Sequence, residues 1–387
     1  MIKTPKVVLI TQDFYPMCGG IATYLEQIYL KYFQKTDFNV IVPDYIGKKK
    51  CYDACSFAVY QTKFSPFTLD VRRERCNKQM LNILDALRPD ILLFGYLRSH
   101  PEVGLFYKSK NPAVKVGIFM HAKEAFINDC ICKKNNILGT HKGYLIKEAE
   151  FYKFILNKAD FIFAVSTFTR NLLIKQGITR EIHIIHPSVQ INQTPLNSLS
   201  GNDKDITLLS VGRLVKRKGQ GKVIEIMPHL LEKYPHLKYV IVGNGPERPF
   251  LKAQIERLCL GNCVTLASGI SNKKLTHYYS LCDIFVLHCD FLPPNDVEGF
   301  GMVFLEANLY GKPVIGGNTG GTSDAIIHGK SGLLINPRST VDLKRTISYL
   351  IENKNIRKEL GSYGRDRVIK NFNNISSDYL VNLFNQA

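Results

Sequence analysis

The hydrophobic residues of this chain gather in short runs that alternate with longer amphipathic segments. The runs have the length and the Val, Ile and Leu content of buried strands, and the segments between them repeat apolar residues at helical spacing. Parallel strands need helix-length connections, so this alternation predicts parallel sheets covered by helices. In the first half the predicted strands are Lys6–Thr11, Phe38–Val42, Asp90–Phe94, Val114–Met120, Asp160–Val165 and His183–His186, and the predicted helices span 21–33, 70–87, 144–157 and 167–176.

The pattern stops and then restarts near the middle of the chain. The stretch from Pro187 to Asp205 is rich in Pro, Ser, Asn and Gly and has no periodicity, which predicts a linker at 191–205. Beyond it the predicted strands are Ile206–Val211, Leu237–Val242, Cys263–Leu266, Asp283–Leu287, Pro313–Ile315 and Gly332–Ile335, with helices near 220–233, 247–259, 272–280, 302–310 and 340–352 and a last helical stretch from about 355.

Each half therefore reads as one doubly wound sheet, and 387 residues suit two such domains. We expect an α/β fold with a Rossmann-like N-terminal domain at 1–190 and a Rossmann-like C-terminal domain at 206–370. A C-terminal helix at about 371–387 should pack back on the first domain. Doubly wound sheets bind ligands beyond the carboxyl ends of their strands, so two facing sheets predict a binding cleft between the domains.

The net charge of +18 narrows the classes of ligand. A basic excess favours nucleic acid, an anionic membrane surface or phosphorylated ligands. The basic residues are dispersed and no nucleic-acid-binding module is recognisable, so nucleic acid is not an expected partner. Phosphorylated substrates and lipid surfaces remain.

The sequence contains no apolar run of the roughly 18 residues that a membrane-spanning helix needs, and its first apolar run is too short for a signal peptide. We therefore expect a cytoplasmic protein. The pairs Cys51/Cys55, Cys130/Cys132 and Cys259/Cys263 do not have the spacing of zinc sites, so the ten cysteines are expected to be free thiols.

A glycine-rich turn follows the first strand of the first half, and a basic turn follows the first strand of the second half. Gly19-Gly20 opens a helix, where bare amides and the positive helix end suit a diphosphate; the alternative is a turn that needs positive φ. Arg213 and Lys218 follow the first strand of the second half, where two fixed cations would stabilise a diphosphate leaving group. Lys216 and Arg217 are assigned instead to a solvated basic turn.

The segment from Asp296 to Ala307 carries two carboxylates at the start of a helix. Gly299 and Gly301 allow a sharp turn that leaves the first helical amides free for phosphate. Glu298 precedes the helix and Glu306 lies one turn into it, so both can face one ligand and accept hydrogen bonds from sugar hydroxyls. A solvated acidic pair fits poorly with the Gly and Phe around them.

These motifs together resemble the family-4 retaining glycosyltransferases of GT-B fold. The resemblance rests on the spacing Glu298-x7-Glu306, on Gly19-Gly20 and Arg213/Lys218, and on the later run Gly316-Gly317-Asn318-Thr319-Gly320-Gly321, and it covers nearly the whole chain. The form Asp296-Val297-Glu298-Gly299 is most similar to bacterial mannosyltransferases, including those of phosphatidylinositol mannoside synthesis and polysaccharide assembly.

The resemblance implies a role for each matching position. Glu298 would bind hydroxyls of the donor hexose, Glu306 the ribose, and His121 the hexose near the reaction centre, although a lone His at a strand end is otherwise structural. Ala122 stands where Gly is common. The implied catalytic residues are His121, Glu298, Arg213 and Lys218, and the implied donor-binding residues are Gly19, Gly20, Arg213, Lys218, Ser268, Gly269, Glu298, Gly299, Phe300, Gly301, Met302, Val303 and Glu306.

No metal and no cofactor are expected. The pair Asp203/Asp205 lies in the linker, and cationic side chains with helix ends can replace Mg²⁺ at the diphosphate. No nucleophilic carboxylate for double displacement is recognisable. The resemblance therefore implies a same-face substitution in which the departing phosphate takes the proton of the acceptor hydroxyl.

The acceptor side is expected in the N-terminal domain. Lys48-Lys49-Lys50, the helix with Arg72, Arg73, Arg75 and Lys78, and the loop Lys123 to Lys147 mix positive charge with apolar residues. This mixture suits peripheral contact with anionic lipid at the inner face of the cytoplasmic membrane; a merely solubilising surface is the alternative.

The expected function is transfer of a hexose, mannose from GDP-mannose, to a lipid-linked or polysaccharide-type acceptor of the cell envelope, such as lipopolysaccharide. The alternative within the class is a retaining enzyme that uses a UDP-sugar of GlcNAc, Glc or Gal. An NAD-dependent Rossmann oxidoreductase is disfavoured, since the turn Gly243-Asn244-Gly245 lacks the third Gly of the dinucleotide fingerprint. A catalytically silent nucleotide-binding protein is a third alternative.

Overall fold

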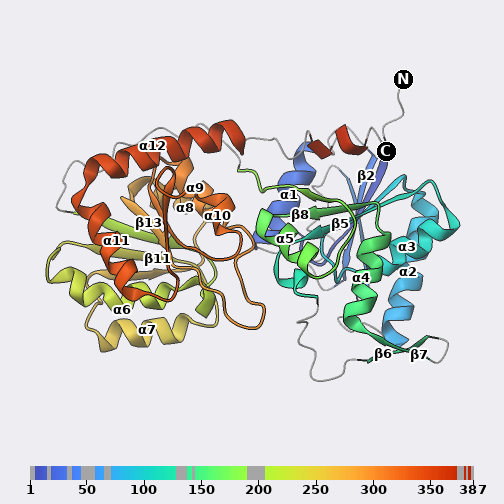
Figure 1. Ribbon diagram of the computed structural model, residues 1–387, viewed down its shortest axis with the longest axis horizontal. Coiled ribbons are helices and arrows are strands. Elements are labelled where there is room, and N and C mark those ends of the chain that lie inside the picture. Colours follow the sequence, from blue (N-terminus) through green and yellow to red (C-terminus); the bar gives the residue numbers. More distant parts are fainter. Residues whose placement is uncertain are drawn as a thin grey trace. The chain divides into compact units, whose positions relative to one another are not determined.

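The computed structural model describes residues 5–14, 19–32, 37–44, 57–64, 71–127, 137–141, 144–189, 205–372, 379–380 and 382–384. The chain divides into two compact units (Figure 1). Unit 1 comprises Met1–Ser188 together with Asn374–Ala387, and unit 2 comprises Val189–Asn373.

Unit 1 is built on a seven-stranded sheet in the order β3-β2-β1-β4-β5-β8-β9, in which every pair is parallel. The order reverses at β1, which pairs with both β2 and β4. A small antiparallel pair, β6-β7, lies outside this sheet. The strands are β1 Lys6–Ile10, β2 Asp37–Pro43, β3 Ala58–Thr62, β4 Ile91–Phe94, β5 Lys115–Met120, β6 Ile137–His141, β7 Tyr144–Lys147, β8 Phe161–Ala164 and β9 Ile182–Ile184, and the helices are α1 Gly20–Tyr32, α2 Val71–Leu87, α3 Pro101–Lys110, α4 Glu148–Lys158 and α5 Thr167–Lys175.

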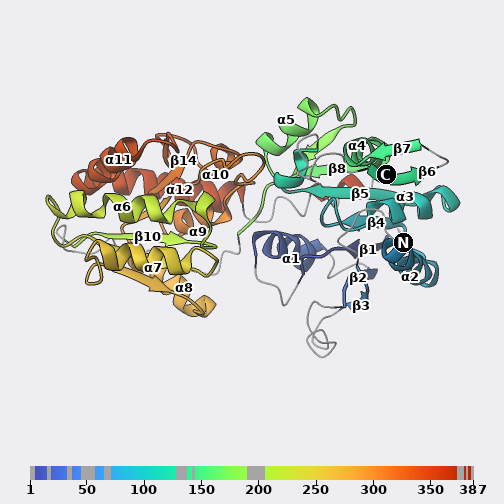
Figure 2. The ribbon, with the colours of Figure 1, turned by 90° about the horizontal axis from the view of Figure 1, so that it is seen from below.

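The central strands of unit 1 are buried along almost their whole length, because helices cover both faces of a parallel sheet. Helices α2, α3 and α4 lie side by side on one face in both views (Figure 1; Figure 2). The C-terminal segment also belongs to this unit. Phe384 is buried against Phe161 and Phe163, and the Tyr379 hydroxyl lies 2.8 Å from His183 Nδ1.

Unit 2 repeats the plan with a six-stranded parallel sheet in the order β12-β11-β10-β13-β14-β15. Here the order reverses at β10, and Figure 1 shows α6, α7 and α11 on one face of the sheet and α8, α9 and α12 on the other. The strands are β10 Thr207–Val211, β11 Lys238–Val242, β12 Val264–Ala267, β13 Ile284–Leu287, β14 Val314–Gly317 and β15 Gly332–Ile335, and the helices are α6 Gln220–Leu231, α7 Arg248–Arg257, α8 Asn272–Leu281, α9 Met302–Leu309, α10 Thr322–Ala325, α11 Thr340–Glu352 and α12 Lys354–Asn371.

The predicted α/β class and doubly wound sheets are confirmed, and every predicted strand exists. The helix expected over 144–157 is wrong at its start, because Tyr144–Lys147 forms β7 and α4 begins only at Glu148. Strands β3 and β6 and helix α3 of unit 1 were also missed. Strand β3 is an edge strand with half-exposed residues and so lacks a continuous apolar run, and α3 has almost no one-sided apolar stripe.

Candidate active site

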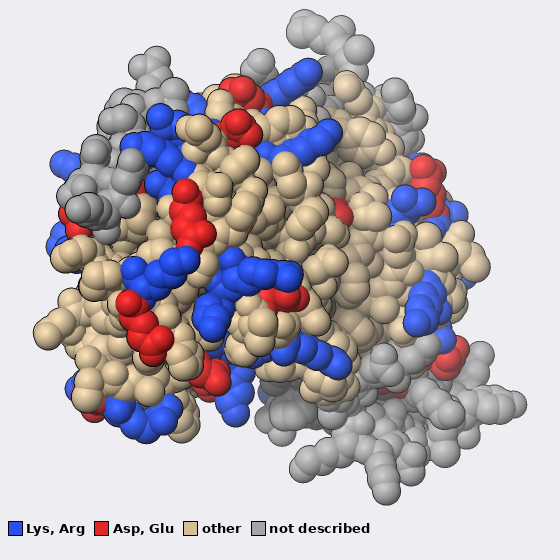
Figure 3. Space-filling model, turned by 60° about the vertical axis from the view of Figure 1, so that its left-hand side comes forward, with Lys and Arg blue, Asp and Glu red and all other residues tan. Residues whose placement is uncertain are grey.

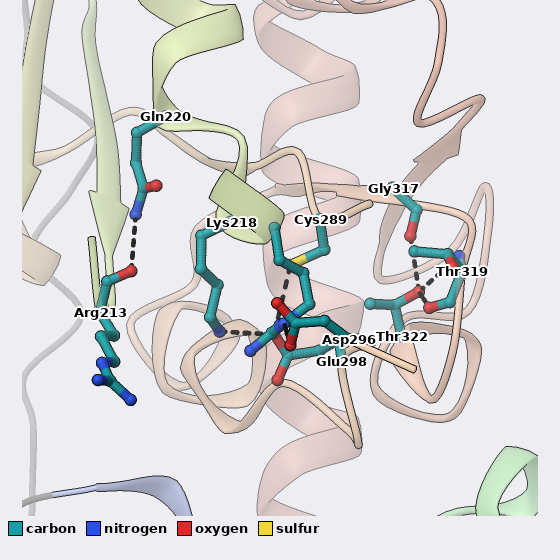
Figure 4. Close-up of polar contacts among 10 residues, drawn as sticks. Arg213, Lys218, Gln220, Cys289, Asp296, Glu298, Gly317, Thr319 and Thr322 are labelled. Atoms are coloured by element: carbon teal, nitrogen blue, oxygen red, sulfur yellow. Dashed lines mark hydrogen bonds and ion pairs between the residues drawn. The ribbon is translucent and has the colours of Figure 1, made fainter. Parts of the chain in front are cut away.

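The candidate site of unit 2 lies where its strand order reverses. Strand β10 pairs with β11 on one side and with β13 on the other, so the loops after β10 and β13 begin next to each other. The first loop carries Arg213 and Lys218, and the second leads to Glu298 and α9. Figure 4 shows the side chains of Lys218 and Cys289 directed at one carboxylate.

That carboxylate is Glu298, and its oxygen Oε2 receives three contacts. Lys218 Nζ and Arg217 Nη1 each lie 2.6 Å from Oε2, and the Cys289 thiol lies 3.5 Å from the same atom. Burial alone raises the pKa of Glu298, but the charges of Lys218 and Arg217 outweigh it and hold the pKa at about 2. Glu298 is therefore ionised at neutral pH and acts only as a hydrogen-bond acceptor.

The assignment of Arg217 to a solvated turn is wrong. Lys216–Lys218 forms a single turn of 3₁₀ helix, in which successive side chains point in directions about 120° apart. Lys216 is exposed, whereas Lys218 is buried and Arg217 lies against Glu298 and Asp296. Sequence reasoning could not tell which of three consecutive cations faces outward, because the length of the loop does not reveal its local helical turn.

The structure does not bring Arg213 to this cluster. Its side chain is exposed and is directed away from Glu298 in Figure 4, and within the described residues no ion pair of Arg213 is found. Its carbonyl oxygen accepts a 3.4 Å hydrogen bond from Gln220 Nε2, and Gln220 is itself buried. Arg213 therefore has a backbone fixed by this hydrogen bond and a long, exposed cationic side chain, and it lies just beyond the carboxyl end of β10.

Glu306 lies on α9, one turn beyond its start. The Tyr279 hydroxyl donates a 2.6 Å hydrogen bond to Glu306 Oε2. Burial raises the pKa of Glu306, while the Tyr279 hydrogen bond and the charge of Lys218 lower it. Both predicted glutamates therefore lie within the electrostatic influence of Lys218.

The start of α9 is open to a ligand's anionic group. Its N-cap is Gly301, at φ 95°, which has no side chain to cap the first amides of the helix. A β-carbon at this position would meet the Phe304 ring at 2.6 Å. Phe300 is buried and packs against Phe372, with 6.0 Å between ring centroids, so only its backbone can face a ligand. Gly299, Met302 and Val303 are half-buried beside it.

A glycine-rich loop after β14 supports Glu298 from behind. The Gly321 amide donates a 2.9 Å hydrogen bond to the Glu298 carbonyl oxygen. A β-carbon on Gly320 would lie 2.3 Å from that oxygen, and one on Gly317 would lie 1.9 Å from the Cys289 carbonyl oxygen. The loop is fixed by Thr322, whose hydroxyl lies 2.7 Å from the Gly317 carbonyl oxygen (Figure 4). Close backbone approach therefore requires glycine here.

The remaining predicted residue pair of unit 2, Ser268 and Gly269, forms the exposed turn after β12, and Gly269 has φ 64°. The pair follows the strand next but one to β10 in the sheet. Their predicted place beside the nucleotide base stays a prediction.

In unit 1, Gly19 and Gly20 lie at the start of α1. Neither has a positive φ, and a β-carbon on either would meet no described atom within 4 Å. The alternative explanation, a turn that needs positive φ, is therefore wrong. The glycines leave bare backbone at the positive end of a helix.

His121 follows β5, and its ring is tightly held. Its Nε2 lies 2.9 Å from the Gly95 carbonyl oxygen, and its ring meets that of Tyr24 edge-on at 5.4 Å. Burial lowers the pKa of His121 to about 4, so the imidazole is neutral at pH 7. Ala122, at φ 89° and ψ −63°, has a backbone conformation that favours glycine.

Sequence reasoning missed Glu124 beside His121. Its carboxylate accepts a hydrogen bond from the His121 amide, and it is buried at 3% exposure. Burial raises its pKa to about 7. The only signal in the sequence is its position three residues after His121, at the end of a buried strand.

The expected acceptor surface lies only partly within the described residues, and its role stays a prediction. Arg73 was expected on a lipid-facing helix surface, and this is wrong: it is buried and forms a two-point ion pair with Glu102, at 2.6 and 2.9 Å. Arg75 and Lys78 are exposed. Lys48–Lys50, the Arg72 side chain and the side chains of residues 128–147 lie outside the described residues.

An apolar groove of about 1050 Å³ lies between α2, α3 and α4. Phe106 and Phe154, which line it, are 48% and 58% exposed. Lys78 and Lys158 stand at its rim, and Lys110 Nζ lies 4.7 Å from the centre of the Phe106 ring. On the face shown in Figure 3, by contrast, basic side chains alternate with acidic ones and form no continuous patch.

No group of three or more His, Cys, Asp or Glu that could hold a metal is found in the described part of the chain, and of the linker pair only Asp205 is described. Cys76, Cys259, Cys263, Cys282 and Cys289 are free thiols, as predicted; the other cysteines lie outside the described residues. Within those residues no helix is long and apolar enough to cross a membrane.

Comparison with known proteins identifies the family. Residues 19–193 match the family described as Glycosyltransferase Family 4, and residues 195–367 match Glycosyl transferases group 1. The chain belongs to glycosyltransferase family 4. The predicted enzyme class is thereby confirmed, and the oxidoreductase alternative falls.

Family-4 relatives resemble the enzyme along nearly its whole length. A GDP-mannose-dependent α-(1-6)-phosphatidylinositol monomannoside mannosyltransferase of Mycobacterium tuberculosis is 25% identical over 377 residues, which cover 94% of this chain and 93% of the relative. An uncharacterised glycosyltransferase of Methanocaldococcus jannaschii is 26% identical over 362 residues, covering 93% and 92%.

Solved structures confirm the GT-B fold. HepE of Anabaena, in complex with UDP and glucose, has a TM-score of 0.76 at 20% identity and covers 99% of this chain and 100% of its own. The lipopolysaccharide outer core galactosyltransferase WaaB, in its apo form, has a TM-score of 0.73 at 20% identity, with 99% and 100% coverage.

Proposed function

We propose that this glycosyltransferase transfers mannose from GDP-mannose to a lipid-linked or polysaccharide-type acceptor, with retention of configuration and without a metal ion. One observation carries the proposal: the ionised Glu298 carboxylate lies between two cations at the switch point of unit 2. Such a group accepts hydrogen bonds from sugar hydroxyls, and the neighbouring Lys218 suits a diphosphate.

The residues divide between the two ends of the donor. Lys218, the exposed Arg213 and the uncapped amides of α9 would bind the diphosphate and stabilise the charge that develops on it as the glycosidic bond breaks. Glu298 would accept from the hexose hydroxyls, and Glu306 from the ribose. His121, neutral at pH 7, would contact the hexose as a hydrogen-bonding group without adding charge.

Retention follows if the acceptor attacks from the face that the diphosphate leaves. The acceptor hydroxyl oxygen then bonds to the anomeric carbon, the bond from that carbon to the phosphate oxygen breaks, and the phosphate oxygen takes the hydroxyl proton. No carboxylate nucleophile is needed in this scheme. The cations at Lys218 and Arg213 would lower its barrier by stabilising the departing diphosphate.

The choice of mannose rests on the M. tuberculosis relative, whose name specifies GDP-mannose and whose similarity covers both units. The second candidate is a UDP-sugar, because HepE was solved with UDP-glucose. Purified enzyme should release GDP from GDP-mannose in the presence of acceptor lipid extract, and turnover should survive EDTA. If the enzyme releases UDP from UDP-sugars and no GDP from GDP-mannose, the donor is a UDP-sugar. If EDTA abolishes turnover and Mg²⁺ restores it, the metal-independent scheme is overturned.

The lipid-linked acceptor is supported by the groove between α2, α3 and α4. Its exposed Phe106 and Phe154 would contact hydrocarbon, while Lys78 and Lys158 would meet anionic headgroups. Sedimentation with vesicles of anionic phospholipid should bind the enzyme, and vesicles of neutral phospholipid should not. Phe106→Ser with Phe154→Ser should weaken that binding; an unchanged bound fraction would exclude the groove as the lipid contact.

A further inference from the structure

Arg217 bridges two acidic residues of the loop before α9. Its Nε lies 3.1 Å from Asp296 Oδ1, and its Nη1 lies 2.6 Å from Glu298 Oε2. The side chains of Arg217 and Glu298 are 15% and 12% exposed, so their contact is shielded from solvent, whereas the Asp296 side chain is 42% exposed. Because the guanidinium is planar and has several donors, it can hold both carboxylates at a fixed separation.

Lys218 shares the same oxygen of Glu298 but has a single compact charge. In the proposed function it has a second anionic partner, the donor diphosphate. If Lys218 turned to the diphosphate, Glu298 would lose one of its two cations while still being buried. A buried carboxylate that loses its partners is costly, so another cation must remain on it.

The geometry points to Arg217 as that cation. We propose that Arg217 is a positioning residue: anchored by Asp296, it keeps Oε2 of Glu298 engaged when Lys218 turns to the diphosphate, so that Oε1 is aimed at the hexose hydroxyls. This inference rests on the proposed function, and it gives a specific role to a residue outside the predicted donor-binding set. Arg217 would touch neither the sugar nor the phosphate.

The test compares Arg217→Gln with Lys218→Gln. Arg217→Gln should lower kcat/KM for the nucleotide sugar by about 10- to 100-fold, as expected for loss of a charged hydrogen bond in the transition state. Its affinity for the free nucleoside diphosphate, measured by calorimetric titration, should change less than about threefold. Lys218→Gln should weaken that affinity at least about tenfold.

Two further readouts separate positioning from a general loss of charge. Arg217→Lys should recover part of kcat/KM, because an ammonium reaches Glu298 but cannot also hold Asp296 in the same plane. The acidic limb of the pH profile should move to higher pH in Arg217→Gln, since Glu298 then keeps only one cation. The matched control is Lys216→Gln, which removes an adjacent exposed cation and should leave both constants within about twofold.

Three results would overturn the inference. The first is a kcat/KM of Arg217→Gln equal to that of Lys216→Gln. The second is a diphosphate affinity of Arg217→Gln as low as that of Lys218→Gln, which would make Arg217 a direct phosphate ligand. If Arg217→Gln does not fold, Asp296→Asn takes its place: it should lower kcat/KM with unchanged diphosphate affinity, and full activity would refute the anchoring. Failure of the wild-type enzyme to transfer any sugar would instead refute the proposed function.

Discussion

Lys218 Nζ and Glu298 Oε2 are 2.6 Å apart, although the two residues come from different loops of unit 2. The contact exists because β10 and β13 are neighbours in the sheet and their following loops meet. It places a cation suited to a diphosphate beside a carboxylate suited to a sugar. The electrostatics and the testable chemistry of the site follow from this arrangement.

The two glutamates should have separable effects on binding. Glu306→Gln should weaken binding of free GDP and of GDP-mannose alike, because both contain the ribose. Glu298→Gln should leave GDP affinity nearly unchanged and reduce transfer, with each loss about 10- to 100-fold. Calorimetric titration and initial rates at saturating donor measure the two effects. Equal loss of GDP affinity in both variants would mean that Glu298 does not contact the hexose.

The stability of the enzyme should depend on the ionisation of Glu298. Its pKa in the folded protein, about 2, lies below the ordinary value of 4.5, so the stabilisation is present above about pH 4.5 and is lost as the pH falls toward 2. Glu298→Gln should therefore lose less stability than the wild type between pH 5 and pH 3. Urea unfolding at several pH values measures this slope, and the exposed Glu256→Gln is the control.

The stability of the folded protein should also depend on the protonation of His121, whose pKa lies below that of an ordinary histidine. Burial lowers the pKa of His121 in the folded protein to about 4, so the unfolded chain takes up a proton at this residue first as the pH falls below 6.5. The free energy of unfolding should therefore decrease between pH 6.5 and pH 4, and His288 adds a similar effect. His121→Gln should reduce the pH dependence of stability in this window, whereas the exposed His229→Gln should not. A limb near pH 6.5 in the activity profile that disappears in His121→Gln would contradict a neutral imidazole.

Ala122→Gly should be tolerated, unlike most changes of a buried alanine. The conformation at φ 89° and ψ −63° is strained for an L-residue by about 1–3 kcal/mol, and glycine relieves it. The relief should offset the greater freedom of glycine in the unfolded chain and the lost methyl contact. Thermal unfolding should show the variant to be at least as stable as the wild type. Ala253→Gly, on the exposed side of α7, should instead lose about 1 kcal/mol.

The sequence by itself determined the architecture and indicated the candidate site residues. Alternating apolar runs and amphipathic segments specify parallel sheets because each strand must be buried on both faces and each return must be a helix. The Gly, Glu and basic residues of the loops after the strands carry the family resemblance, which depends only on residue types and their spacing along the sequence. Strand β3 was not predicted, because an edge strand does not need a continuous apolar run.

Only the tertiary structure decided which charges meet. Lys216, Arg217 and Lys218 are consecutive and chemically similar, but a single 3₁₀ turn directs the first to solvent and the other two to Glu298. Arg73 lies in a basic cluster of the sequence, yet Glu102 from another helix buries it in an ion pair. Glu124 likewise lies in a turn that packs against α5, a helix from later in the chain. A residue's exposure and partners are set by packing between elements, which spacing along one element does not record.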